Sequence, residues 1–225
     1  MSENRRMFVF RLAHNNEPGE PKGACPLSYT EVMKKIKNMP GSEIVPIEYT
    51  EETFQFLHDE LWEHNVLRQG WGLDGQDLRR YPEEKTKQEY MTRWNSNFML
   101  NEKKRHGRNI DCSIAKGRWN ILSRMLEFQK DDIIFLPKVA KGYIYDAYDH
   151  FTVCQVADVY YFNGPTQNDD FQHCVKIKNL KTFPYGQDTL LRSDFGSPYC
   201  YAILEAKEKH QKYATFLEFT KKHFK

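Results

Sequence analysis

Residues 173–183 read HCVKIKNLKTF and alternate between apolar and basic side chains along most of their length. Val175, Ile177 and Leu180 occupy one side of this pattern, opposite Lys176, Lys178 and Lys181. A period of two is typical of a β-strand with one buried face. The single slip between Ile177 and Leu180 predicts a β-bulge. The segment is therefore a strand whose apolar face packs on a core.

Other apolar runs bounded by polar turns predict further strands. They are Met7–Ala13 (MFVFRLA), Ile133–Val139 (IIFLPKV), His150–Phe162 (HFTVCQVADVYYF) and Tyr201–Leu204. Short strands joined by polar turns favour a small curved β-sheet or pseudobarrel.

Helical spacing of apolar residues predicts the elements that flank this sheet. We expect helices at Ser28–Asn38, at Thr50–Val66, at Ile114–Phe128 and from residue 204 to Lys225, where Phe216 and Phe219 face inward. In Ile114–Phe128 the shared apolar face consists of Trp119, Leu122, Met125 and Leu126. The polar segment Asp77–Gly107 is predicted to contain a helix and a mobile, basic excursion. No internal repeat or linker divides residues 1–225, so we expect a single α+β domain.

Composition excludes several classes of protein. The chain has 225 residues, 40% of them hydrophobic, and a formal net charge of +2, so contacts with nucleic acid require locally gathered basic residues. Five scattered cysteines without CxxC spacing favour reduced thiols and a cytoplasmic protein. No segment has the length and apolarity of a signal peptide or a membrane span, so we expect a soluble protein without membrane contact.

The stretch Leu67–Gly75 (LRQGWGLDG) places a tryptophan among glycines, between an arginine and an aspartate. Glycines let the main chain adopt positive φ and approach a neighbour closely, which predicts a turn. Trp71 in such a turn is either a plug for the core or a flat surface for a ligand.

The order of motifs along the chain resembles that of a known family. The turn Gln69–Gly72 is followed by the helix ending at Phe128, the strand entry Lys130–Ile134, the aromatic strand ending at Tyr160–Phe162, and His173 before Val175 and Lys176. Over roughly residues 67–183 this order resembles the EVE-like domains, relatives of YTH domains in the PUA-like superfamily. Such domains lie at the N-terminus of modification-dependent restriction endonucleases.

The resemblance implies a non-catalytic reader that flips a modified base out of nucleic acid, DNA in preference to RNA, into an aromatic pocket of a pseudobarrel. Trp71 would be one stacking wall, with Trp119 or Tyr161 opposite and Asp74 or Asp158 as acceptors for the base edge. The glycines beside Trp71 would leave room for the nucleotide backbone. The residues expected to contact phosphates are Arg79, Arg80, Lys103, Lys104, Arg105 and Arg108.

The same resemblance suggests a role in restriction or defence, with a nuclease or motor subunit on another chain as a further partner. No cofactor or metal is expected, because His150 with Cys154, and His173 with Cys174, lack the further ligands of a zinc site.

Two other functions stay open. One alternative is a metal-dependent nuclease, in which two carboxylates hold Mg²⁺ and a lysine orients water. The residue types of this set occur here as Asp194, Glu205 and Lys207. Too few residues follow Lys207 for the remainder of such a nuclease core. The second alternative is an interaction protein whose aromatic side chains all belong to the core.

Overall fold

The computed structural model describes residues 5–12, 51–73, 75–106, 109–141, 143–144, 149–163, 170–196 and 202–224. The described strands are β1 (Met7–Phe10), β2 (Val66–Gln69), β3 (Ile133–Pro137), β4 (Val139–Ala140), β5 (Tyr143–Ile144), β6 (His150–Val156), β7 (Tyr161–Phe162), β8 (His173–Pro184) and β9 (Ile203–Ala206). The described helices are α2 (Glu51–Trp62), α3 (Lys87–His106), α4 (Cys112–Leu122) and α5 (Tyr213–His223), with 3₁₀ turns at Ser123–Glu127 and Arg192–Phe195. The predicted α+β class is confirmed.

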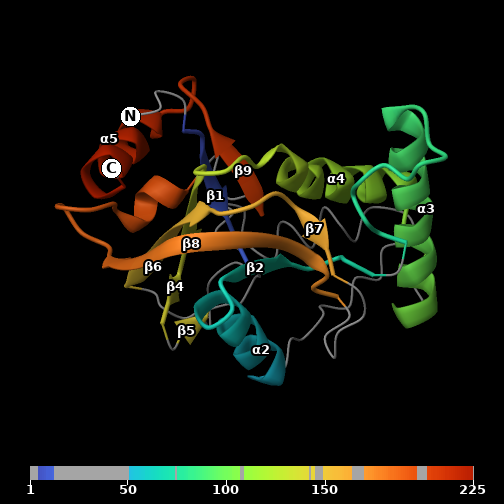
Figure 1. The fold of residues 1–225 in the computed structure, drawn as a ribbon, viewed down its shortest axis with the longest axis horizontal. Coiled ribbons are helices and arrows are strands. Elements are labelled where there is room, and N and C mark those ends of the chain that lie inside the picture. Colours follow the sequence, from blue (N-terminus) through green and yellow to red (C-terminus); the bar gives the residue numbers. More distant parts are fainter. Residues whose placement is uncertain are drawn as a thin grey trace.

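One mixed sheet contains strands from both ends of the sequence. Its order is β2-β8-β6-β3-β1-β9, and β7 pairs with the first residues of β8 on the edge opposite β2. The pair β1 and β3 is parallel, whereas the other pairs of this sheet are antiparallel. Figure 1 shows β8 curving across the sheet, which wraps as a half-barrel. This shape agrees with the curved sheet expected from the sequence.

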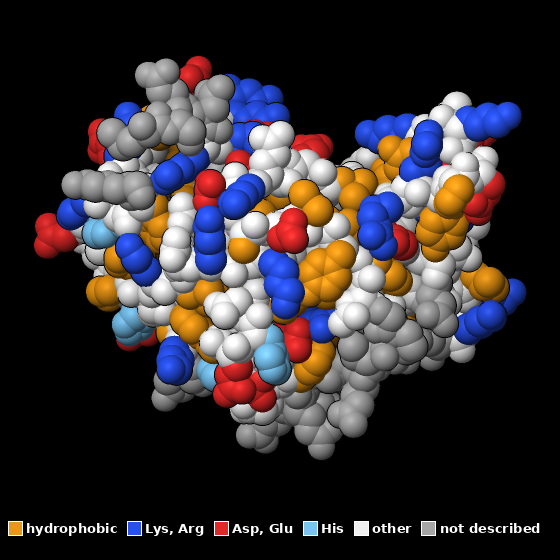
Figure 2. Space-filling view, in the orientation of Figure 1, with side chains coloured by type: hydrophobic (Ala, Val, Ile, Leu, Met, Phe, Trp, Pro, Cys, Tyr) orange, Lys and Arg blue, Asp and Glu red, His pale blue; other side chains and the backbone are white. Residues whose placement is uncertain are grey.

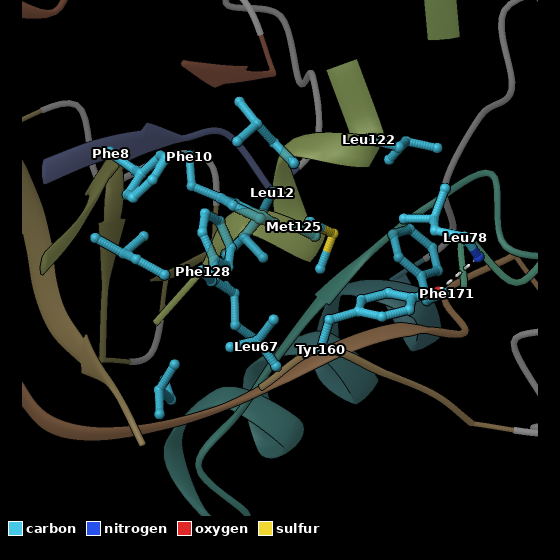
Figure 3. Packing of buried hydrophobic residues seen from close by; sticks show 14 of the residues in the cluster. Phe8, Phe10, Leu12, Leu67, Leu78, Leu122, Met125, Phe128, Tyr160 and Phe171 are labelled. Carbon is cyan, nitrogen blue, oxygen red and sulfur yellow. Dashed lines mark hydrogen bonds between the residues drawn. The ribbon is translucent and has the colours of Figure 1, made fainter. Parts of the chain in front are cut away.

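Each face of the sheet carries its own apolar core. On the inner face, side chains such as Phe8, Leu67 and Val175 pack with α3 and α4 through Trp94 and Trp119. Figure 3 shows part of this inner core, in which Phe8, Phe10 and Phe128 gather beside Met125. On the outer face, α5 covers β1, β3 and β6 by packing Phe216 and Phe219 on Phe135. The prediction that Phe216 and Phe219 face inward is confirmed.

The predicted bulge in β8 is also confirmed. Gln155 of β6 pairs with Lys178, but Val153 pairs with Lys181, so the two residues 179 and 180 of β8 oppose the single residue Cys154 of β6. The extra residue is Asn179, whose φ of 53° is in the left-handed region that asparagine tolerates better than most residues. The bulge resets the alternation and leaves Leu180 against the inner core.

Several of the expected boundaries need correction. The helix expected after residue 204 begins at Tyr213, because strand β9 continues to Ala206. The helix predicted at Thr50–Val66 ends at Trp62, and Val66 begins strand β2. The strand predicted at His150–Phe162 is two strands, β6 and β7, separated by residues 157–160. In the segment Asp77–Gly107, predicted to contain a helix and a mobile, basic excursion, helix α3 continues through the basic residues 102–106. Leu126 is 37% exposed because the last turn at Ser123–Glu127 is 3₁₀, which rotates it away from the buried face. The helix predicted at Ser28–Asn38 lies outside the described residues.

Candidate functional site

The turn after β2 holds Trp71 in an uncommon backbone conformation. Its φ is 64°, in the left-handed region, where a bulky side chain is rare and costs conformational energy. The Trp71 N–H donates to Oδ1 of Asp170 at 2.9 Å, and the Gly72 N–H donates to the Asp170 carbonyl at 2.8 Å. Both bonds come from the segment that leads into β8, so tertiary contacts hold this conformation in place.

Gly72 is required by close approach of the main chain. A Cβ at this position would lie 2.9 Å from the backbone nitrogen of Gln172 and 3.0 Å from that of His173. The predicted turn is therefore confirmed, but the expectation that this glycine leaves room for a nucleotide backbone is wrong. The start of β8 fills that space.

His173 forms a hydrogen bond to the Trp71 turn from inside the protein. Its ring is fully buried, and desolvation lowers the pKa of the imidazole from 6.5 to about 4, so the ring is neutral at neutral pH. The Trp71 carbonyl only accepts, so Nε2 of His173 carries the proton and donates to it at 3.1 Å. Nδ1 then accepts from the Tyr160 hydroxyl at 2.9 Å.

Tyr160 extends this chain of hydrogen bonds across the inner core. Its hydroxyl accepts from the Leu78 N–H at 3.3 Å, the bond drawn dashed in Figure 3 among apolar neighbours such as Phe171. Burial raises the pKa of the Tyr160 hydroxyl, which keeps it protonated. The chain ties the Trp71 turn to the loop before α3, so the position of Trp71 depends on packed elements.

The indole of Trp71 lies at the border between the inner core and the surface. It is half-buried and packs on the core, and the guanidinium carbon of Arg118 lies 4.4 Å from the centre of its ring. A guanidinium at this distance over an indole makes a cation–π contact. The ring is therefore neither sealed in the interior nor freely exposed.

Helix α4 positions Arg118. The helix begins at the N-cap Asp111, whose side chain accepts from the Ser113 N–H at 2.6 Å. The next residue along the helix, Trp119, is 1% exposed and packs against Tyr90 and Trp94 with ring centroids 5.7 Å away in each case. With Trp119 anchored in the core, the preceding residue Arg118 lies at the surface over Trp71. The prediction that Trp119 stacks on a base is wrong, because the core encloses it.

A surface pocket adjoins Arg118. It lies between α4 and β9 and has a volume of about 580 Å³. Figure 2 shows the surface hollowed at the upper edge, where Figure 1 places α4 between β9 and α3. The pocket combines an aliphatic lining with two guanidinium groups, and the residues concerned are Ile114, Ile121, Ile203, Leu204, Arg118 and Arg124. Arg118 thus belongs both to the pocket and to the face of Trp71.

The other residues predicted to bind the base do not gather around Trp71. Tyr161 pairs with Cys174, on the face of the sheet opposite His173, and burial raises the pKa of its hydroxyl to about 12. The neighbouring Phe162 is on the inner face, 5.3 Å from His173 between ring centroids. Asp158 is exposed, and its Oδ1 accepts from the Val159 N–H at 2.8 Å. Asp74 lies outside the described residues.

The described residues among the predicted phosphate contacts form two groups, one in the loop before α3 and one near the end of α3. In the second turn of α3, Arg93 donates to the carbonyls of Gly75, Asp77 and Arg79 and forms an ion pair with Glu84 at 2.7 Å. These bonds hold the exposed Arg80, and Arg79, which pairs with Asp77 at 2.6 Å. The second group lies ten residues beyond Arg93, about 15 Å along the helix axis, and consists of the exposed Lys103 and Lys104. The side chain of Arg105 and the whole of Arg108 lie outside the described residues.

Comparison of the chain with known protein families, curated proteins and solved structures finds no match. The resemblance to EVE-like domains therefore stays a prediction. In the described part of the chain, no helix has both the length and the apolarity that crossing a membrane demands.

The residues of the nuclease alternative have different ion-pair partners in the structure. Lys207 pairs with Glu205 at 3.0 Å, so these two side chains come together. Asp194 instead pairs with Lys212 at 2.9 Å, and its other oxygen accepts from the Leu191 N–H at 2.8 Å. Within the described ranges, the carboxylates, imidazoles and thiols form no cluster of three or more that could hold a metal ion.

The histidine and cysteine pairs considered for zinc have other partners. His150 contacts Asp149 at 2.7 Å, whereas burial raises the pKa of the Cys154 thiol in the core. The Cys174 thiol faces Arg68, 3.2 Å away, on the side of the sheet opposite the His173 ring. Among the described residues, Cys112, Cys154 and Cys174 carry free thiols, in agreement with the expectation for these three, whereas Cys25 and Cys200 lie outside the described residues.

Sequence reasoning missed Arg118, Asp170 and Tyr160. Arg118 is one of two basic residues in α4, and no spacing pattern indicates that its side chain contacts a turn far away in the sequence. The sequence contains a partial indication that Asp170 accepts backbone hydrogen bonds. It lies just before the alternating strand, in a loop rich in Asn and Asp, and the side chains of these residues accept backbone hydrogen bonds in turns.

Proposed function

We propose that this protein is a non-catalytic module that recognises a modified base in nucleic acid, in DNA rather than RNA, with the base flipped out and stacked at Trp71. The observation that carries the proposal is the half-exposed indole, fixed at positive φ, with a guanidinium on its ring and a pocket of about 580 Å³ beside that guanidinium.

The backbone of Trp71 supports a functional role. Left-handed conformations of non-glycine residues persist where surrounding structure holds them, and they concentrate at binding and catalytic sites. Trp71 has such a conformation and is held through both Asp170 and His173. A residue needed only to fill the core would not require this arrangement, since a buried tryptophan such as Trp119 fits an ordinary helix.

Stacking accounts for the energetics of base capture. A flipped base loses its neighbours in the duplex at a cost of a few kcal/mol, and one aromatic ring returns about 1–3 kcal/mol by stacking. The planar guanidinium of Arg118 covers one face of the Trp71 ring, so we expect a captured base to stack on the guanidinium or to displace it, and the guanidinium charge suits a phosphate or a base edge. Together, Trp71 and Arg118 offer a nucleotide both a stacking surface and a positive charge.

The pocket between α4 and β9 gives a place for the modification. Its volume of about 580 Å³ is within the range of about 300–1,000 Å³ that small-molecule sites occupy. Its aliphatic lining suits an apolar substituent such as a methyl group on a pyrimidine. The basic groups on α3, with Arg79 and Arg80, would contact the phosphates on either side.

A substitution experiment tests the proposal with a matched control. Trp71→Ala should weaken binding to a duplex that carries 5-methylcytosine or 5-hydroxymethylcytosine by about 5- to 150-fold, which corresponds to about 1–3 kcal/mol of lost stacking. Trp62→Ala removes another half-buried indole, on α2, and should leave the affinity unchanged. Trp71→Phe keeps a flat ring and should retain part of the affinity. Fluorescence anisotropy at fixed salt measures each affinity.

Unfolding curves of the variants separate loss of the stacking surface from loss of the fold. If the wild-type protein binds modified and unmodified duplexes equally, modification reading is refuted. If Trp71→Ala folds and binds as tightly as the wild type, Trp71 is not the base platform.

A further inference from the structure

The bulge in β8 has an effect on the outer face of the sheet. Cys174, Lys176 and Lys178 point outward by the ordinary alternation of a strand, and residue 181 would point inward if the alternation continued. Because the bulge adds Asn179, Lys181 returns to the outer face instead. The position of Phe183 confirms that odd-numbered residues after the bulge point outward, since Phe183 packs on Phe219 of α5 on the outer face.

The result is an evenly spaced row of lysines. Lys176 and Lys178 are two residues apart, which is about 6.7 Å along a strand. Lys178 and Lys181 oppose positions of β6 that are also two residues apart, so the same spacing of about 6.7 Å is repeated. Lys176 and Lys181 are exposed, and Lys178 is 37% exposed at its side chain.

The end of α5 continues the row. The Lys181 ammonium donates to the His223 carbonyl at 2.8 Å, and the last turn of α5 adds the exposed Lys221 and Lys222. Burial lowers the pKa of His223, and the nearby ammonium groups of Lys222 and Lys181 lower it further. In Figure 2, Lys and Arg side chains lie over the region where Figure 1 shows β8 and the end of α5.

An acidic residue partly offsets this charge. Asp131 pairs with Lys178 at 2.6 Å, and this hydrogen bond, with the positive charges of Arg5 and Lys130, lowers the pKa of the Asp131 carboxyl. Lys176 and Lys181 have no such carboxylate within ion-pair distance in the described part of the chain. Since the whole chain has a formal charge of only +2, this concentration of lysine is a local feature of one face.

We propose that the outer face of β8, from Lys176 through Lys181 to the end of α5, is a second nucleic-acid contact that binds the phosphate backbone of a DNA duplex without regard to base or modification. The inference rests on the proposed function for its choice of polymer. Evenly spaced ammonium groups suit a polymer with evenly spaced charges, and each ammonium keeps donors for phosphate oxygens. This face is distinct from the Trp71 site, because the outer-facing lysines and the inner-facing His173 are on opposite sides of the same strand.

The salt dependence of binding to an unmodified duplex tests this contact. Each phosphate that a lysine neutralises contributes about −0.9 to the slope of log K against log salt concentration. Lys176→Gln/Lys181→Gln should therefore make the slope shallower by about 1.8. The control Lys141→Gln/Lys209→Gln has the same change of net charge at two exposed lysines outside β8 and α5, and should leave the slope unchanged. Lys176→Arg/Lys181→Arg keeps both charges and should retain the wild-type slope.

The outcomes separate this inference from the proposed function. If both glutamine variants change the slope equally, or if neither does, the lysine row is not a backbone contact, while discrimination of modified bases at Trp71 can still hold. If Trp71→Ala abolishes discrimination, and Lys176→Gln/Lys181→Gln makes the slope shallower while the control pair does not, both proposals are supported. Binding to vesicles that contain phosphatidylserine, with no binding to duplex at any salt concentration, would overturn both.

Discussion

Replacing Gly72 with alanine should destabilise the protein through one added methyl group. The new Cβ would lie 2.9 Å and 3.0 Å from the backbone nitrogens of Gln172 and His173, and 3.1 Å from the His173 ring. Two of these three atoms belong to the main chain at the start of β8, which pairs with β2 through Gln69 and cannot move without disturbing that pairing. Overpacking of this kind costs about 1–3 kcal/mol.

Gly117→Ala makes the same chemical change where the structure predicts the opposite sign. Gly117 is in the middle of α4, and a Cβ there would meet no atom within 4 Å. Alanine is favoured over glycine inside a helix by about 0.8–1.0 kcal/mol, because it restricts the unfolded chain. Gly117→Ala should therefore stabilise the protein.

The two variants should differ by about 2–4 kcal/mol in the free energy of unfolding. For a chain of this size, that corresponds to a difference of about 4 °C or more in Tm. Urea unfolding followed by circular dichroism gives the free energies, and a thermal scan gives the Tm values. A Gly72→Ala variant as stable as the wild type would refute the close approach of the Trp71 turn to β8. The same variant should also bind modified duplex less tightly, because the added methyl group displaces the adjacent indole.

Two further predictions concern pH and the loop before α3. His173 has a pKa of about 4 in the folded protein and 6.5 in the unfolded chain. As the pH falls, the unfolded chain therefore binds a proton before the folded protein does. The contribution of His173 to the free energy of unfolding should be complete above pH 6.5 and fall by about 3 kcal/mol as the pH approaches 4. Urea unfolding at a series of pH values should show this decline in the wild type and not in His173→Gln, and equal slopes would refute it. Arg93→Lys cannot reproduce the fork that reaches the carbonyls of Gly75, Asp77 and Arg79, so we expect a loss of about 2–3 kcal/mol and faster hydrogen exchange in residues 75–84. Unchanged exchange in that segment would contradict this role of Arg93.

The features that the sequence predicted correctly depend on local patterns. The alternation of Val175, Ile177 and Leu180 indicated both the strand and its bulge, because a period of two and its interruption are visible along a single segment. The helix around Trp119 was predicted for the same reason, from a face of apolar residues that repeats at helical spacing.

The features that were missed depend on contacts between distant segments. Strand β2 has four residues, and its assignment comes from pairing with β8, where Arg68 opposes Cys174. Before that pairing is known, Leu67–Gln69 is indistinguishable from the start of the glycine turn. The contact between Arg118 and Trp71 joins a helix and a turn that share no sequence pattern, and it requires the tertiary fold to be seen.

The pairing of β1 has a consequence for the kinetics of folding. Its neighbours in the sheet are β3 and β9, and residues beside it form hydrogen bonds to partners 126 and 184 positions later in the chain. The apolar segment Met7–Phe10 therefore has no strand to join until the ribosome has synthesised β3. Non-local pairing of this kind slows folding, and an unpaired apolar strand invites aggregation. We expect the yield of native protein to depend on chaperones that shield this segment until the last strand has been synthesised.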